Sequence, residues 1–387
     1  MNLSSYLHRR IRQVCTLLCS AVALVTLPAP AQNNVDPSDY YQREELSFDR
    51  AAPASDHYLW TRKMHGYSDT NFNYRQMLFV CLSSSDPKNG ACPTSNSGNA
   101  GISSISLRFT ERRSRLSQVL VVRGYMERYF TNSGCFTTGW GTRQHHLTSN
   151  NHQVCGDQIS PRGSASTIWI PQSELARLPS GGVWTAQLIL KLKTYASQPI
   201  GAANTYTVDF KLDVTDHNNM QIYLPAYGVS TPLVDLNLRT RPLSNGPGGI
   251  VSGQTVVDAC LYDGYNANSQ RYEIRVTGTN PVPGMDGRFF VHHASGGIGE
   301  RNRIEYKVRT RTANLGETQH VSGQPVSFTG INNADIRAVR LPNVPFPVVC
   351  TPWPITLQTP AFNQIDKNTG QYRGELKLEF TPSTSSP

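Results

Sequence analysis

Residues 206–215 read YTVDFKLDVT, and residues 372–381 read YRGELKLEFT. Both follow the order Tyr-x-x-acid-apolar-Lys-Leu-acid-apolar-Thr, so apolar and charged side chains alternate. Successive side chains of a β-strand point to opposite faces, and this alternation is therefore typical of a strand with one buried face. We interpret the two stretches as equivalent last strands of two β-domains. The alternative is that two unrelated amphipathic strands share this pattern.

The same period of two recurs along most of the chain, with turn residues between the runs. Only residues 172–178 have a helical pattern, and they are long enough for two turns at most. Many short strands at this spacing favour an all-β protein built from β-sandwiches. The other stretches that we expect to be strands are residues 105–109, 118–122, 167–170, 187–193, 221–224, 234–238, 272–276, 303–308 and 355–358.

A polar break, Asp216-His217-Asn218-Asn219, follows the first of the two matching stretches directly. We place the domain boundary there, with a first domain over residues 32–216 and a second over residues 217–387. Both lengths lie within the usual range for a single domain, about 100–200 residues.

The N-terminal residues 1–31 are predicted to be a secretory signal peptide. Arg9, Arg10 and Arg12 precede an apolar run from residue 14 to residue 27, and Ala29-Pro-Ala31 is a small-x-small cleavage site. The apolar run is shorter than the ~20 residues that a membrane-spanning helix needs, which disfavours a membrane anchor. A lipoprotein signal at Cys19 is a weaker alternative, because bulky leucines precede this cysteine.

Cleavage after residue 31 lowers the formal charge from +9 to +6, because three arginines leave, and it lowers the cysteine count from eight to six. An even number of cysteines in an exported chain indicates disulfides, and six cysteines allow 15 connectivities. Sequence order favours Cys81–Cys92, Cys135–Cys155 and Cys260–Cys350. No CxxC or comparable His spacing indicates a zinc site.

No catalytic motif is evident, and we expect neither an enzyme nor a cofactor or metal ion. The paired histidines at 145–146 and 292–293 are interpreted as exposed residues. Residues 101–150 carry an excess of arginines with aromatic residues among them. Such a surface suits an acidic glycan, an anionic lipid or a nucleic acid, of which nucleic acid fits an exported protein least; the alternative is an ordinary solvated face. The residues are Arg108, Arg112, Arg113, Arg115, Arg123, Arg128 and Arg143, with Phe109, Tyr125, Tyr129 and Phe130.

Several longer motifs resemble the minor tip pilins of the colonization-factor (CFA/I) and cable-pilus fimbriae. They run in the family's order through nearly the whole mature chain. The best are FVCLSSS at 79–85 with NGACP at 89–93, LRFTERRS at 107–114, IPQSELARLPSGGVW at 170–184, VDLNLR at 234–239, VDACLYDGY at 257–265, and GQY at 370–372 through FTP at 380–382.

This resemblance implies two Ig-like domains, an N-terminal adhesin domain and a C-terminal pilin domain that lacks one strand and awaits a donor strand. It implies partners as well: a periplasmic chaperone, an outer-membrane usher, a major pilin and a host-surface glycan or glycoprotein, with no nucleic acid. Its cysteine pattern supports the three disulfides above. The implied function is adhesion at the fimbrial tip, on the cell surface, together with initiation of pilus assembly.

The chain departs from the family at the receptor positions. Intestinal members carry an arginine before the first cysteine motif and an arginine pair after the strand that follows Gly-Val-Trp. Here Arg75 lies one position from the first register, where Gln76 stands, and Thr194-Tyr195 replaces the pair after Lys193. Our candidates for receptor contact are Arg75, Arg113, Lys193 and Tyr195, on a patch away from the second domain, with an acidic glycan as ligand.

Two alternatives remain at this stage. The first is an assembly-initiating minor pilin with little receptor binding of its own. The second is a secreted carbohydrate-active enzyme on β-sandwich modules, which lacks a catalytic signature.

Overall fold

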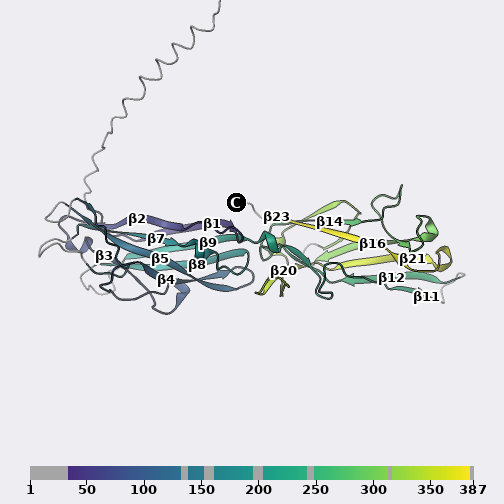
Figure 1. The fold of residues 1–387 in the computed structure, drawn as a ribbon, viewed down its shortest axis with the longest axis horizontal. Helices are drawn as coiled ribbons and strands as arrows, with labels where there is room; N and C mark the ends of the chain where they lie inside the picture. Colours follow the sequence, from purple (N-terminus) through teal and green to yellow (C-terminus); the bar gives the residue numbers. More distant parts are fainter. Residues whose placement is uncertain are drawn as a thin grey trace, which may run out of the picture.

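The computed structural model describes residues 34–131, 138–151, 161–194, 204–241, 248–312 and 316–383. Strands dominate these ranges and form two bodies that lie end to end (Figure 1). The predicted all-β architecture with two domains in tandem is therefore confirmed. The predicted signal peptide, Tyr195 and the Cys135–Cys155 pair lie outside the described residues.

The first domain is one extended sheet that supplies both layers of the sandwich. Its strand order is β1-β9-β8-β4-β5-β7-β2, with β3 paired to β8 and β6 paired to β5. Strands β1 and β9 are parallel, and the other pairs are antiparallel. The strands are β1 (Tyr40–Asp49), β2 (His57–Tyr67), β3 (Met77–Cys81), β4 (Ser103–Glu111), β5 (Ser117–Phe130), β6 (Gly139–Trp140), β7 (Gly163–Ile170), β8 (Gly182–Thr194) and β9 (Asn204–Thr215).

The alternating pattern at 206–215 forms β9 as predicted. Val208, Phe210 and Leu212 are at most 3% exposed and belong to the core cluster of this domain, whereas Asp209 and Lys211 face outward. The helical pattern after residue 171 yields only α2 (Gln172–Leu175), a helix of four residues. Short 3-10 helices form at Phe72–Tyr74 and Pro87–Asn89.

The second domain contains a 7-stranded sheet in the order β11-β12-β21-β16-β15-β22, with β17 on β16, and two smaller sheets, β10-β13-β20-β19 and β18-β14-β23. Its first strands are β10 (Gln221–Tyr223), β11 (Leu238–Arg241), β12 (Ile250–Val257), β13 (Cys260–Tyr262), β14 (Arg271–Gly278), β15 (Phe289–His293) and β16 (Arg303–Thr312). The others are β17 (Gly316–Gln319), β18 (Pro325–Thr329), β19 (Arg337–Val339), β20 (Val348–Pro352), β21 (Ile355–Asn363), β22 (Tyr372–Arg373) and β23 (Leu376–Ser383). Its 3-10 helices are η5 (Glu300–Asn302), η6 (Ile331–Asn333) and η7 (Gln364–Asp366).

Two strand predictions in this domain are wrong in detail. The stretch 372–381 is not one strand, because β22 pairs with β15 in one sheet and β23 pairs with β14 in another. At the crossing, a Cβ on Gly374 would lie 2.9 Å from the carbonyl oxygen of Phe290, so the backbone approaches too closely for a side chain. The stretch 234–238 contributes only Leu238 to a strand, since Asn237 has a φ of 51°.

Two of the three predicted cysteine pairs are disulfides in the structure. Cys81 at the end of β3 bonds to Cys92, and Cys260 of β13 bonds to Cys350 of β20. The second bond links strands 90 residues apart in the sequence, beside the small core cluster formed with Tyr262, Leu341 and Val348.

Candidate functional site

The two ends of the first domain differ, because one faces the second domain and the other is distal to it. Strand β3 pairs with β8 so that Met77 lies opposite Thr194 and Leu78 lies opposite Lys193. Arg75 and Lys193 are therefore brought to the same distal end. Strand β8 begins at the other end with Gly182, next to the second domain.

Arg75 does not extend freely into solvent. Its Nε donates a 2.8 Å hydrogen bond to the carbonyl of Ser68, and its Nη2 donates to the carbonyl of Asp69. Arg162 donates to the same Asp69 carbonyl at 2.8 Å. Burial, followed by the neighbouring charge of Arg162, lowers the pKa of Arg75. Arg162 therefore belongs to the distal basic group, although no motif marks it in the sequence.

Arg128 lies inside the domain rather than on the predicted basic surface. It is 1% exposed and donates hydrogen bonds of 2.7 Å to the carbonyl of Met77 and 2.8 Å to that of Ser149. A third bond, of 2.7 Å, reaches the hydroxyl of Ser164. Burial lowers the pKa of Arg128 to about 10. This cation ties three segments together at the distal end.

Gln76, which occupies the register of the family's first receptor arginine, is fully buried, and both polar atoms of its side chain lack a hydrogen-bond partner in the described structure.

His145 is also fully buried, so its interpretation as an exposed histidine is wrong. Its backbone pairs with Met126, which holds it in the domain interior. Burial, together with the charges of Arg128 and Arg143, lowers the pKa of His145 to about 4.

Arg113 lies at the junction and not on a patch away from the second domain. Its guanidinium donates hydrogen bonds to the carbonyl oxygens of Ile331 at 3.3 Å, Asn332, and Ala334 at 2.5 Å. The neighbouring Arg112 donates to the side-chain oxygen of Asn268 at 2.7 Å. The predicted location of Arg113 is therefore wrong. Its guanidinium bonds to backbone carbonyls of the second domain.

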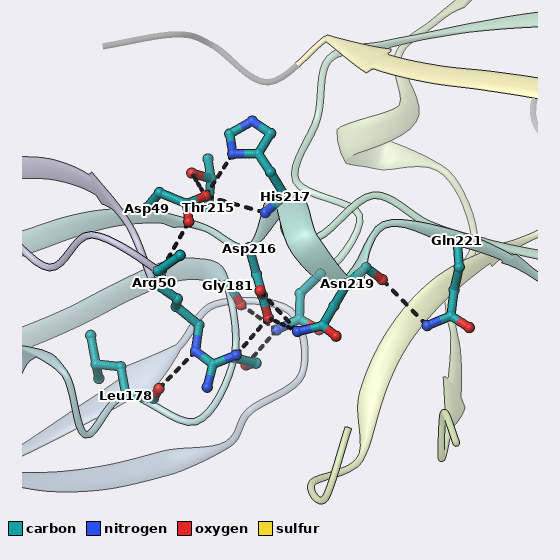
Figure 2. Close-up of polar contacts among 12 residues, drawn as sticks. Asp49, Arg50, Leu178, Gly181, Thr215, Asp216, His217, Asn219 and Gln221 are labelled. Carbon is teal, nitrogen blue, oxygen red and sulfur yellow. Dashed lines mark hydrogen bonds and ion pairs between the residues drawn. The ribbon is translucent and has the colours of Figure 1, made fainter. Parts of the chain in front are cut away.

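The polar stretch after β9 is bonded closely to the first domain (Figure 2). Asp216 is 3% exposed and accepts a 2.6 Å ion pair from Arg50, while His217 begins the 3-10 helix η4 (His217–Asn219) and contacts Asp49 at 2.6 Å. Burial alone would raise the pKa of Asp49. Hydrogen bonds from the amides of Ala51 and His217, the His217 ring and the Thr215 hydroxyl instead hold this pKa at about 2.

The last strand of the second domain, β23, has β14 as a neighbour on one side. No strand of the described chain pairs with its other edge. Leu376, Leu378 and Phe380 of β23 are only partly buried against the core. A narrow apolar pocket is lined by Leu378 and Phe380 together with Ile274, Val276 and Trp353. β23 therefore has an unpaired edge, and its apolar side chains border a narrow internal pocket.

The described ranges hold no cluster of three or more His, Cys, Asp or Glu side chains with the geometry of a metal site. Across the same ranges, no helix has the length and apolar character that a bilayer-crossing helix needs.

Comparisons with known proteins cover both domains. A family model for the first domain of CfaE, a CFA/I fimbrial subunit, matches residues 29–217, and one for its second domain matches residues 220–384. The chain is 34% identical over 349 residues to this CFA/I fimbrial subunit of Escherichia coli, and the match covers 87% of this chain and 89% of that protein.

Solved structures agree. The crystal structure of CfaE, the adhesive subunit of the CFA/I fimbria of enterotoxigenic Escherichia coli, superimposes with a TM-score of 0.77 at 29% identity, covering 92% of this chain and 95% of that one. A chain from a chaperone–tip adhesin complex of CFA/I fimbriae biogenesis gives a TM-score of 0.65 at 29% identity, covering 90% and 98%.

Proposed function

Because this chain belongs to the CfaE family of CFA/I fimbrial subunits, we propose that it adheres to a host-surface receptor from the tip of a fimbrium and initiates assembly of that fimbrium. The chain is a fimbrial adhesin subunit, and this family is one of non-enzymatic subunits. Membership in this family argues against the alternative of a secreted carbohydrate-active enzyme.

The family relationship supports a periplasmic pilus chaperone as a partner of the chain and a surface fimbria as its location. We extend this to an outer-membrane usher and to a major pilin that donates a strand. The open edge of β23 is the observation that carries this proposal. An incoming strand satisfies the free backbone groups there and inserts apolar side chains beside Leu378 and Phe380.

The other end of the chain supports a tip position. Strand β1 (Tyr40–Asp49) pairs along its full length with β9, and Val35 bridges to Tyr67. The backbone of the described N-terminal segment is therefore paired within its own domain. A segment bound in this way is not available for donation to a neighbour. We infer that the subunit accepts a strand and donates none, which allows only the tip position.

For receptor contact we propose the distal end, with Arg75 and Lys193 and with Arg162 beside Arg75. Tyr195 remains a candidate from the sequence. A guanidinium binds carboxylate or sulfate groups well, which favours an acidic glycan. The bonds of Arg75 to the Ser68 and Asp69 carbonyls favour a second role for it in holding the 68–69 loop. If receptor binding at this end is absent, the chain is mainly an assembly initiator.

Fimbriated cells that carry Arg75→Ala plus Lys193→Ala test the receptor proposal, with Lys211→Ala on the outward side of β9 as the control. We expect adhesion to fall in the double variant and to persist in the control, with equal fimbriation. Immunogold labelling tests the position: label at the fibre ends supports it, and label repeated along the shaft refutes it.

A further inference from the structure

The outward side of strands β2, β7 and β5 carries an unusual set of side chains, which we call the lateral aromatic face. Strand β5 turns Val122, Met126 and Phe130 inward, and its alternate residues therefore face outward. The neighbouring Trp169 of β7 is likewise only partly buried between two buried isoleucines. The face consists of Tyr58, Arg62, Arg123, Tyr125, Glu127, Tyr129, Trp140 and Trp169.

Three residues form one row across the strands. Tyr58 of β2 is directly opposite Trp169, and Trp169 is directly opposite Arg123. The rings of Tyr58 and Trp169 are stacked, with centroids 5.8 Å apart and planes at 23°. Tyr125 adds an edge contact to Trp169 at 6.0 Å. Tyr58 is 50% exposed, so this cluster presents ring surface to solvent.

A second aromatic cluster lies further along the same strands. Tyr129 and Trp140 are paired residues whose ring centroids are 5.2 Å apart. The guanidinium of Arg62 lies over the Trp140 ring, 5.4 Å from its centroid. It also forms an ion pair with Glu127, in which Nη2 and Nε donate to Oε1 at 2.7 and 3.1 Å. The φ of Arg62 is 45°, at a point where the β2 register shifts, and this bulge orients its side chain along the face.

Such rings are not a general feature of this side of the sheet. The outward positions of the adjacent strand β4 carry Ser104, Ser106, Arg108 and Thr110, none of which is aromatic. Tyr58 is 50% exposed, and the side chain of Arg62 is 49% exposed. Tyr125, Tyr129, Trp140 and Trp169 are partly buried and Tyr58 is exposed. A group of partly exposed rings with polar groups between them is typical of a binding surface rather than a core.

We propose that the lateral aromatic face binds an oligosaccharide that carries a carboxylate or sulfate group. Tyr and Trp rings offer flat apolar surfaces to the CH faces of sugar rings, and their polar tips suit hydroxyl groups. Arg123 is exposed beside Trp169, and nowhere in the described chain does its guanidinium form a hydrogen bond or ion pair. Glu127 is already neutralised by Arg62, so the net charge of the face is positive and complements an acidic sugar.

The spacing favours a saccharide over a protein partner. From Tyr125 to Tyr129 the strand rises about 13 Å, so the two ring clusters are separated by more than one sugar ring, with the Arg62–Glu127 pair between them. A protein interface has instead a contiguous apolar centre. The face runs along the side of the domain and reaches the distal end at Tyr129, whose ring packs on Tyr67 at 5.9 Å. Neither Arg75 nor Lys193 belongs to it, and the Tyr58–Trp169–Arg123 row at its other end gives the proposal a test separate from the distal site.

The test uses the mature chain purified with its chaperone. A heparin-derived hexasaccharide, 3′-sialyllactose and neutral lactose are titrated while tryptophan fluorescence is recorded. We expect an acidic probe to bind and lactose not to bind at the same concentrations. Tyr58→Ala and Arg123→Gln should each weaken binding about tenfold. Tyr41→Ala, which removes another exposed tyrosine, and Arg75→Ala plus Lys193→Ala should leave it unchanged.

Any of several results would overturn the proposal. Among them are no binding of either acidic probe, equal binding of lactose, and unchanged affinity in both Tyr58→Ala and Arg123→Gln with the fold shown intact by near-UV circular dichroism. Preferential binding of an enzymatically deglycosylated protein at this face would also overturn it, in favour of a protein partner. Loss of probe binding in the distal double variant alone would assign the sugar to the distal end instead.

Discussion

The guanidinium of Arg113 donates a 2.5 Å hydrogen bond to the carbonyl oxygen of Ala334 and thereby joins the first domain to the second. Two further carbonyls, of Ile331 and Asn332, accept from the same side chain. A hydrogen bond to a charged group is worth about 1.5–3 kcal/mol. Because Arg113 is half-buried and water replaces its bonds in part, we expect Arg113→Ala to weaken the junction by about as much as the loss of one such bond. In differential scanning calorimetry we expect the unfolding transitions of the two domains to separate further. Arg43→Ala, on the outside of β1, is the control, and identical thermograms for both variants would contradict this role.

His65 should make the first domain sensitive to acid. It is buried among Tyr206, Ser166 and Trp60, and burial, with smaller contributions from Lys63 and Arg128, lowers its pKa to about 3. The unfolded chain binds a proton near pH 6.5, whereas the folded chain does not until about pH 3. Stability therefore falls as pH drops through this window, by about 2 kcal/mol at pH 5 from this residue alone.

Urea unfolding of wild type and His65→Gln at pH 7 and pH 5 measures this effect. The variant is expected to be less stable at pH 7, because it loses the shape of the imidazole, but to have a shallower dependence on pH. His145 contributes in the same direction in both proteins, so a residual slope is expected. A slope as steep in the variant as in wild type would show that His65 is not the titrating group.

Much of this architecture is predictable from local pattern. The period of two in residues 206–215 predicts which side of β9 is buried, since Val208 and Leu212 face the core. The same argument, applied to β5, would have found the buried Arg128, because it has the same parity as Val122 and Met126. The arginines of residues 101–150 thus include an interior cation, Arg128, together with surface residues and with Arg113 at the junction.

Other features depend on contacts between distant segments and leave no local signal. The split of 372–381 into β22 and β23 follows from the close approach of Gly374 to Phe290. Arg113 crosses to Ala334, 221 positions along the chain, and nothing near residue 113 indicates which end of the sandwich faces the second domain. The lateral aromatic face likewise joins strands β2, β5 and β7, and only their register brings Tyr58 beside Trp169.

The Cys260–Cys350 disulfide should be needed for the second domain to accumulate. It closes a loop of 90 residues, and in the chain-entropy model such a bond contributes about 4–5 kcal/mol by restricting the unfolded chain. It also links β13 to β20 in a domain whose β23 edge is still unpaired. We expect Cys260→Ser and Cys350→Ser to lower periplasmic yield sharply and to the same extent. Wild-type yield and melting temperature in both variants would argue against this role.

Removal of the Arg128 guanidinium should loosen the distal end of the first domain. The side chain has no acidic partner among its contacts, and it bonds instead to Met77, Ser149 and Ser164. In Arg128→Met, these buried oxygens lose their donor while the volume is nearly kept, and we expect a loss of about 3 kcal/mol. Arg128→Lys should lose nearly as much, because one ammonium group does not reproduce the planar fork that spans three segments. Hydrogen exchange should then quicken first at the Phe79 amide, which donates to the carbonyl of Leu147. Uniform acceleration across β9 and β3 would instead indicate a global loss of stability with no special role at the distal end.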